Sequence, residues 1–442
     1  MENRERTHNP QGPTARNEGE FPRSIPEEGK LELTNQNLEI LLQNKQLLEA
    51  ILDGNNMRKA WQAVSANQGA AGIDGLSIAE TKAELHQHWA SIKASIMLGK
   101  YRPKAPREVR IPKSSGGTRK LSIPTVIDRL IQQAIAQKLS AYIDGSFAAE
   151  SYGYRPNRSA RQAVRQAKQY IDEGYEVTLD LDIEDYFGTV NQDRLISELR
   201  KLISDQRVIS LIRSILTSNG KGGKGLPQGG PLSPLLSNLY LDPLDKELKA
   251  RGHKFVRYAD DCRVFLGSEK SGERVYRSIE KFIRKKLRLK LNEKKSGFSK
   301  KCKFLGFELK RNGVRISPEA VKRLKDKVRG IVKIRGGKAV SRVLQELKPI
   351  LMGWNTYYNV RQKAVYKTLN SWINRRLRAM IYKSMKNGET RYKFFKRHMR
   401  SEHVAYRCAY SNYGPWSMAL CKPMRIIYSG VKLVSMGLYH LR

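Results

Sequence analysis

Two adjacent aspartates, Asp260 and Asp261, lie in the stretch of the chain most able to carry chemistry. The residues on both sides of them are β-forming, so the sequence predicts a hairpin over residues 255–264 with the carboxylates at its tip. Adjacent carboxylates repel each other, and a divalent cation between them relieves that repulsion. A solvated turn is the alternative explanation. The metal-site hypothesis therefore depends on a third carboxylate and on a nucleotide-binding region elsewhere.

Asp182 is the candidate third carboxylate. Apolar and polar residues alternate over residues 176–182, which predicts a strand with Asp180 and Asp182 on its polar face. An EF-hand loop beginning at Asp180 is excluded. Its sixth position is Asp185 rather than glycine, and its twelfth is Asn191 rather than glutamate.

A glycine-rich segment over residues 220–231 is the candidate nucleotide-binding region. A helix is expected directly after it, with Ser233 as N-cap and Pro234 in the first position. Glycines before a helix amino terminus allow the backbone to approach a nucleotide closely. The segment is not a P-loop, because the order G-x-x-x-x-G-K-[ST] is missing.

A second hairpin is predicted over residues 109–124, around Ser114-Ser115-Gly116-Gly117. It carries Lys113 and Arg119 on the two sides of its tip, where both cations could reach one anion such as a triphosphate. An edge strand charged for solubility is the alternative explanation.

The composition indicates a nucleic-acid partner. The 442 residues include 83 Lys and Arg against 42 Asp and Glu, a formal net charge of +41. An acidic polymer would neutralise this excess, and an anionic membrane surface is the alternative. No run approaches 18 apolar residues and no signal-peptide core is present, so we expect a soluble, cytoplasmic protein without membrane contact. The four cysteines lack CxxC spacing, which argues against a disulfide framework or structural zinc.

The chain divides into five predicted segments. Residues 1–32 are poor in apolar residues and are expected to be disordered, and residues 33–100 form a helical extension. Residues 101–312 hold both hairpins, a helix over 127–139, a helix over 272–289 and a strand over 304–309. A boundary is expected near residues 313–318, followed by a helical segment over 318–395 and a basic carboxy-terminal segment over 396–442.

Two basic, aromatic stretches are candidate nucleic-acid contacts. The first is the loop at residues 151–158, which contains Arg155. The second spans residues 361–400, where 13 Lys and Arg face a single acid and aromatic residues are interleaved. Arg375, Arg376 and Arg378 lie in it. A solvated charged face is the alternative, although this imbalance exceeds what solubility needs.

Taken together, these motifs resemble a reverse transcriptase of the group II intron type, the intron-encoded maturases. The likeness covers roughly residues 57–442 and depends on motifs in the family's order. They are residues 67–75, Ile111-Pro112-Lys113, residues 117–124, Asp128-Arg129 with Gln132-Gln133, residues 151–156, residues 226–230 with 233–236, Tyr258-Ala259-Asp260-Asp261, Asn292 with Lys295-Ser296, residues 304–307 and residues 353–358.

The resemblance implies a two-metal polymerase site. Asp182 and Asp260 would bind two Mg²⁺ ions, with Mn²⁺ as an alternative, and Asp261 would support the same cluster. Lys295 would protonate the departing pyrophosphate.

The resemblance also assigns the nucleotide contacts. Lys113 and Arg119 would clamp the phosphates of a deoxynucleoside triphosphate. Gln228, Gly229 and Gly230 would pack against the templating base pair, and Phe187 would exclude a ribose 2′-hydroxyl.

One departure from the family pattern concerns the loop after Asp182. The family usually has Phe-Asp where this chain has Phe187-Gly188, and often has histidine where this chain has Gln192. Gly188 is expected to weaken the loop that follows, which raises the prospect of altered or lost polymerase activity.

The fold implied is α+β, a right-hand polymerase with an antiparallel palm sheet and an all-helical thumb. The family's optional endonuclease domain is expected to be absent. The implied partners are an RNA template, intron RNA, a DNA primer or target and deoxynucleoside triphosphates, in a bacterial cytoplasm or an organelle matrix. Whether the protein forms a homodimer stays open.

Three functions are compatible with these motifs. The first is an RNA-directed DNA polymerase that is also a splicing maturase acting in intron mobility. The second is an RNA-binding maturase with a weak or silent polymerase, and the third is a related bacterial reverse transcriptase working in defence or repair.

Overall fold

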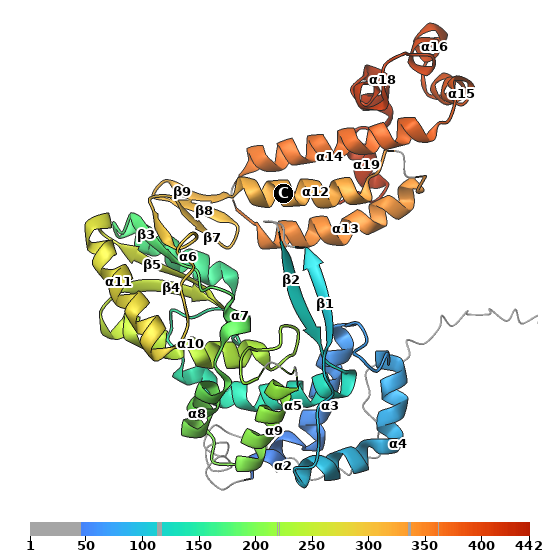
Figure 1. Cartoon of the computed structure of the whole chain (residues 1–442). Coiled ribbons are helices and arrows are strands. Elements are labelled where there is room, and N and C mark those ends of the chain that lie inside the picture. The colour runs from blue at the N-terminus through green and yellow to red at the C-terminus, as the bar shows by residue number, and fades with distance from the viewer. Residues whose placement is uncertain (1–45, 113–116, 219, 221, 335–336, 361) are drawn as a thin grey trace, which may run out of the picture. The chain divides into compact units, whose positions relative to one another are not determined.

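The computed structural model describes residues 46–112, 117–218, 220, 222–334, 337–360 and 362–442 (Figure 1). The predictions for residues 1–32, and the predicted phosphate contact of Lys113, lie outside these ranges. The chain forms two compact units. One comprises the chain up to Gln166 together with Gly174–Lys300, and the other comprises Ala167–Glu173 with Lys301–Arg442.

A four-stranded antiparallel sheet lies in the first unit. Its strands are β4 (Lys254–Tyr258), β5 (Asp261–Leu266), β3 (Val177–Leu181) and β6 (Gly297–Ser299), in that order. Leu181 at the end of β3 pairs with Cys262 near the start of β5. Because these strands run antiparallel, Asp182 emerges at the same edge of the sheet as the β4–β5 turn.

The helices of this unit begin with α2 (Leu47–Ile51), α3 (Gly54–Ala66), α4 (Ile78–Met97) and α5 (Val126–Ile143). A 3₁₀ turn, η1 (Asp144–Ser146), precedes α6 (Ala160–Asp172), whose last turns belong to the second unit. The others are α7 (Tyr186–Thr189), α8 (Gln192–Leu202), α9 (Gln206–Thr217), α10 (Ser233–Ala250) and α11 (Glu269–Lys286). The expected helix over 127–139 is therefore confirmed within α5.

The predicted basic hairpin is confirmed by β1 (Arg107–Pro112) and β2 (Thr118–Ile123). They pair antiparallel from Arg107 opposite Ile123 to Pro112 opposite Thr118. β1 is mostly exposed, whereas Ser122 near the end of β2 is buried.

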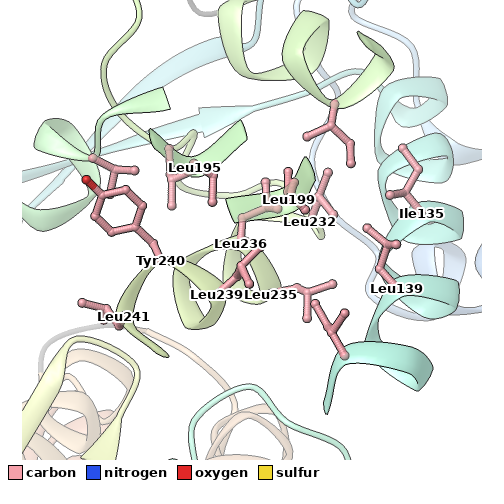
Figure 2. Packing of buried hydrophobic residues seen from close by; sticks show 14 of the residues in the cluster. Ile135, Leu139, Leu195, Leu199, Leu232, Leu235, Leu236, Leu239, Tyr240 and Leu241 are labelled. Atoms are coloured by element: carbon pink, nitrogen blue, oxygen red, sulfur yellow. The ribbon is translucent and has the colours of Figure 1, made fainter. Parts of the chain in front are cut away.

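The core of the first unit is organised around α10. Figure 2 shows its side chains among those of α8 and α5; the labelled residues are Leu232, Leu235, Leu236, Leu239, Tyr240, Leu241, Leu195, Leu199, Ile135 and Leu139. Each fully buried leucine contributes roughly 1.5–3 kcal/mol through removal of apolar surface from water. The same apolar stripe gives α10 a rigid position directly after the glycine-rich segment.

The predicted cap of α10 is wrong by one residue. Leu232 is the N-cap, and Ser233 is the first helical residue. The Ser233 hydroxyl donates instead to the carbonyl of Pro227 at 2.6 Å. The serine therefore ties the helix back to the glycine-rich segment rather than capping its own amide groups.

The helix expected over 272–289 is shifted towards the amino terminus. Ser268 caps α11 by accepting a hydrogen bond from the Ser271 amide at 3.3 Å. The helix ends at Lys286, and Arg288 adopts a left-handed conformation with φ 52°. A helical continuation through Arg288 is incompatible with that backbone geometry.

The second unit contains a three-stranded antiparallel sheet of β7 (Cys302–Phe304), β8 (Phe307–Lys310) and β9 (Gly313–Ile316). The prediction of one strand over 304–309 is wrong, because the chain reverses at Leu305 and Gly306, which have φ of 50° and 81°. Phe304 consequently pairs with Phe307 across a tight turn.

The rest of the second unit is helical. Its long helices are α12 (Pro318–Ile331), α13 (Val340–Tyr357), α14 (Lys363–Ser384) and α15 (Gly388–His398). Shorter ones follow: α16 (Glu402–Ala409), α17 (Pro415–Met418), α18 (Lys422–Ile427) and α19 (Gly430–Ser435). Antiparallel sheets combined with helices confirm the predicted α+β class. Within the described ranges, no helix has the length and apolar character to cross a bilayer.

Candidate active site

The β4–β5 hairpin presents Asp260 at its tip, as predicted. Tyr258 pairs with Asp261, so only Ala259 and Asp260 form the connection. Ala259 has φ 59°, in the left-handed region that a two-residue hairpin requires. Asp261 is the first residue of β5. The two carboxylates thus differ in position, one on the turn and one on the strand.

A buried network of Arg257, Asp245 and Asn238 holds this turn in place. Arg257 is fully buried, and its Nε donates to Asp245 Oδ1 at 2.7 Å. Its Nη1 donates to Asn238 Oδ1 and to the Ala259 carbonyl, both at 2.9 Å. The turn is therefore fixed by a guanidinium that bonds to its backbone. Sequence reasoning missed this role, although an arginine within an otherwise apolar strand is its signal.

The loop at residues 151–156 packs against the same turn. A Cβ added to Gly153 would overlap the Ala259 amide nitrogen, so only glycine fits there. Asn238 Nδ2 donates to the Gly153 carbonyl at 2.7 Å, and the Tyr152 amide donates to the Arg257 carbonyl at 2.9 Å. The motif positions the hairpin.

Arg155 of this loop lies inside the protein. Its guanidinium donates to Asp144 Oδ1 at 2.8 Å and to the carbonyls of Ala148 and Ser151 at 2.7 and 2.9 Å. Only 9% of the residue is exposed. This geometry argues against the predicted nucleic-acid contact, because the donors of Arg155 already have internal acceptors.

Asp182 is held through its backbone. Its carbonyl accepts from the Asn292 amide at 2.8 Å, and its amide donates to Ser296 Oγ at 3.1 Å. The side chain stays partly exposed, with Lys295 Nζ at 4.0 Å from Oδ1. The segment after α11 therefore positions both Asp182 and Lys295, which the sequence motif alone did not indicate.

The end of the sheet that carries Asp180, Asp182, Asp260 and Asp261 is called the acidic edge below. Burial has the largest effect on the pKa values of its carboxylates that are shifted. It raises the pKa of Asp260, and the nearby Asp182 adds to that rise while Arg119 opposes it. Burial also raises the pKa of Asp261, against the opposing effect of the Arg263 guanidinium. The pKa of Asp180 rises to about 6, again mainly through burial. Carboxylates with raised pKa values gain from a bound cation.

Arg263 forms ion pairs with two of the four aspartates at the acidic edge. It forms ion pairs with Asp180 Oδ1 at 2.7 Å and with Asp261. Across the described residues, no three His, Cys, Asp or Glu side chains are grouped as a metal cage. Asp261 is paired with Arg263, and joint metal binding by Asp182, Asp260 and Asp261 stays a prediction. Asp182 and Asp260 still offer the oxygen donors that suit Mg²⁺, which binds one or two carboxylates together with substrate phosphates.

A cavity of about 560 Å³ opens beside Asp260. Six of the predicted site residues line it: Arg119, Phe187, Gln228, Gly229, Gly230 and Asp260. Tyr154, Arg129 and Gln133 also contribute to its wall. Residues from widely separated parts of the sequence therefore meet around one space.

The glycines in the cavity wall are required by close packing. The Gln228 carbonyl accepts from the Ser122 amide at 2.7 Å. Gly229 has φ 126°, and a Cβ there would lie 2.6 Å from the Ser122 carbonyl oxygen. A Cβ on Gly230 would overlap Gln132 Oε1. Gln228–Gly230 is therefore wedged against β2 and α5.

Phe187 lies in the short helix α7, edge-on to Tyr186 with ring centroids 5.1 Å apart. Gly188 follows, and a Cβ there would overlap the Asp185 carboxylate. Asp185 itself has φ 38°. The Asp185 carboxylate thus occupies the space beside Gly188, where the family usually has an aspartate side chain on the residue itself.

The predicted arginines of α14 are engaged within the second unit. Arg375 donates to the Trp416 carbonyl at 3.1 Å and stacks on the Trp416 ring, 4.1 Å from its centroid. Arg376 donates to the Val332 carbonyl at 3.0 Å, and Arg378 is buried. Their binding to nucleic acid stays a prediction.

Two family models match the chain. The model described as "Reverse transcriptase (RNA-dependent DNA polymerase)" matches residues 111–309. The model described as "Group II intron, maturase-specific domain" matches residues 321–399. The first match includes the acidic edge and most of the cavity wall, and the second includes α13 and α14.

Three curated relatives illustrate the similarity. Protein YkfC of Escherichia coli (strain K12) is 31% identical over 223 residues, which are 48% of this chain and 58% of that protein. The group II intron-encoded protein LtrA of Lactococcus lactis subsp. cremoris is 27% identical over 333 residues, 57% of this chain and 54% of that protein. The putative COX1/OXI3 intron 1 protein of Saccharomyces cerevisiae is 23% identical over 374 residues, 70% and 43% respectively. The chain thus spans about half the length of these relatives.

Proposed function

The chain belongs to the family of group II intron-encoded reverse transcriptases and maturases, and on that premise we propose that it is an RNA-directed DNA polymerase which also binds intron RNA. The proposed substrates are an RNA template, a DNA primer and deoxynucleoside triphosphates. The observation that carries the proposal is the cavity in which Asp260, Arg119, Phe187 and Gln228–Gly230 meet.

The acidic edge would carry the nucleotidyl transfer. Asp182 and Asp260 are the proposed metal ligands, and Asp261 is proposed to support the same cluster by resemblance alone. Two bound Mg²⁺ ions would activate a primer 3′-hydroxyl and stabilise the leaving oxygen. Lys295, whose side chain is 65% exposed beside Asp182, is the candidate proton donor to pyrophosphate.

The cavity wall would select the nucleotide. Arg119 lines the cavity and would pair with a phosphate, because a guanidinium can bind two phosphate oxygens at once. Phe187 would contact the sugar, and Gln228–Gly230 would contact the templating base pair. Lys113 is proposed as a second phosphate contact by resemblance alone.

The second unit would bind intron RNA. Its matched maturase-specific segment, the proposed thumb at 318–395 and the basic segment at 396–442 support this role. Intron mobility, the compartment and a homodimer are further proposals that rest on the family alone.

A primer-extension assay with Mg²⁺ tests the polymerase. Asp260→Asn should lower the rate by several orders of magnitude, because a metal ligand loses its charge. Asp193→Asn, at a side chain 75% exposed, is the matched control and should extend normally. Near-normal extension by Asp260→Asn would show that the site is assigned wrongly.

A maturase with a silent polymerase is the second candidate, and the pairing of Asp261 with Arg263 favours it. A parent protein that binds and splices its intron RNA but extends no primer would establish this candidate. Synthesis without splicing of any flanking RNA would instead indicate a free-standing reverse transcriptase.

A further inference from the structure

We propose that Gln192 is a positioning residue that links two parts of the site. One is the sugar-contacting loop at residues 187–190, which contains Phe187, and the other is the base-pair cradle, Gln228–Gly230. Loss of Gln192 should relax discrimination against ribonucleotides and against mispaired bases together. This inference rests on the proposed polymerase function, since it concerns how that site selects its nucleotide.

Gln192 is the first residue of α8, and only 4% of it is exposed. Its Nε2 lies 2.9 Å from the Gly225 carbonyl oxygen, 3.0 Å from that of Leu216 and 3.3 Å from that of Lys224. Its backbone amide donates to the Gly223 carbonyl at 3.0 Å. One residue therefore joins the start of α8, the end of α9 and the glycine-rich segment.

Backbone hydrogen bonds extend the junction to Phe187. The Leu226 amide donates to the Phe187 carbonyl at 2.7 Å, and the Gly225 amide donates to the Val190 carbonyl at 2.8 Å. Gly225 has φ 87°, and a Cβ there would lie 3.1 Å from the Phe187 carbonyl oxygen. The backbone of the glycine-rich segment thus lies directly against the backbone of the proposed sugar contact.

The same segment continues into the base-pair cradle. Two residues after Leu226, the Gln228 carbonyl is bonded to β2, and the Pro227 carbonyl is bonded to Ser233 of α10. Phe187 and Gln228 line the same cavity. A displacement at Gly225 would therefore move the sugar contact and the base-pair contact in concert.

The surroundings of Gln192 call for a neutral hydrogen-bond donor. Three carbonyl oxygens surround its Nε2, whereas its Oε1 is buried and accepts no hydrogen bond from the residues that the structure describes. A carboxylate would place negative charge against these carbonyls, so Gln192→Glu should be the most disruptive change. Histidine donates one N–H at a time when neutral, so Gln192→His should be intermediate.

Steady-state incorporation kinetics test the coupling. Gln192→Ala removes the hydrogen bonds from Nε2 to three carbonyl oxygens. The ribonucleotide-to-deoxynucleotide efficiency ratio and the mismatch-to-match ratio should therefore both rise by about tenfold. Phe187→Ala should raise the first ratio and leave the second unchanged. Gln192→His should recover part of both.

Asn56→Ala is the matched control. Asn56 is buried, its Nδ2 donates to the carbonyls of Ile51 and Ala134 at 2.7 and 3.1 Å, and none of these three residues is among those lining the cavity. It should lose stability with both ratios unchanged. If Gln192→Ala also leaves both ratios unchanged, or moves only one, the positioning role is refuted.

Amide hydrogen exchange provides a readout that needs no activity. Gln192→Ala should accelerate exchange at Gly225 and Leu226 and in residues 187–190 alike. Exchange confined to one of the two stretches would overturn the inference. A parent protein without polymerase activity would overturn only the proposed function, and the exchange result would still decide whether Gln192 couples the two stretches.

Discussion

The charged residues at the acidic edge of the first unit and the arginines of α14 in the second unit differ in what they contact. Asp260 lines an open cavity, and burial raises its pKa while the nearby Arg119 opposes that rise. Arg375 and Arg376 instead donate to backbone carbonyls, and Arg378 is buried. The first arrangement favours binding of a cation, whereas the second uses cations to hold helices together.

This contrast separates two properties that a count of charges combines. A formal net charge of +41 indicates a polyanionic partner for the whole molecule. It does not identify the residues that touch that partner, because an arginine bonded internally contributes to the field without forming a direct contact. Binding roles must therefore be assigned one side chain at a time.

The largest expected effect separates the two units by function. Asp260→Ala with Asp261→Ala should abolish cDNA synthesis and leave intron splicing largely intact. Removal of two negative charges does not weaken binding to a polyanion. The measurements are primer extension and a splicing assay on the cognate intron at low Mg²⁺.

Asp260→Ala alone is the control for folding, because it keeps the Asp261–Arg263 ion pair. Loss of splicing by a double variant that remains folded and RNA-bound would contradict the separation of roles.

The next effect concerns the network beneath the acidic turn. Arg257→Leu leaves Asp245 as an uncompensated charge in a fully buried site, which should cost about 3–5 kcal/mol of unfolding free energy. Urea unfolding measures the loss. Arg251→Leu is the control, since that guanidinium pairs with Glu247 at the surface and should cost under about 1 kcal/mol. Equal losses in the two variants would show that the network does not support the turn.

A smaller effect tests the internally bonded arginines. Changing Arg375, Arg376 and Arg378 together to glutamine should lower the free energy of unfolding. It should change the slope of log RNA affinity against log salt only a little. The exposed set Lys383, Lys386 and Arg397, changed in the same way, should lower the slope of log affinity against log salt by about 1–3 units. The reverse ranking of slopes would restore the α14 arginines as phosphate contacts.

The sequence was informative where one residue type has one local use. Alternation around Asp182 and the β-forming flanks of Asp260 predicted both strands, and the glycine-rich segment predicted the cavity wall. It was less informative where a long side chain can turn inward. Arg155 and Arg263 resemble surface cations in the sequence, yet the fold supplies them with carbonyls and carboxylates. The partners of Arg155 lie only 4 to 11 residues away, whereas Asp180 reaches Arg263 from the neighbouring strand β3. In both cases the path of the backbone, and not the residue types, brings the partners together.

The same limit applies to short turns. The reversal at Leu305-Gly306 divides a stretch that has strand-forming residues on both sides. The supports of Asp182 come from Asn292 and Ser296, more than a hundred residues away. Pairing in three dimensions decides both outcomes.

The smallest effect concerns Gly188 and tests whether its loop is weak. In a helix, alanine is favoured over glycine by about 0.5–1 kcal/mol. At this position, however, the new Cβ would overlap the Asp185 carboxylate, which must rotate away. We therefore expect Gly188→Ala to change stability by less than about 0.5 kcal/mol.

Asp185→Gly removes both the obstructing carboxylate and the strain of a left-handed non-glycine residue at φ 38°. It should stabilise the protein by up to about 1 kcal/mol. In the double variant the alanine gains its full helical benefit, so the combined stabilisation should exceed the sum of the single changes by about 0.5 kcal/mol or more. Denaturant unfolding of the four proteins measures this coupling. Additive single changes would mean that Asp185 does not occupy the space above Gly188, and that the loop after Asp182 lacks the filling carboxylate.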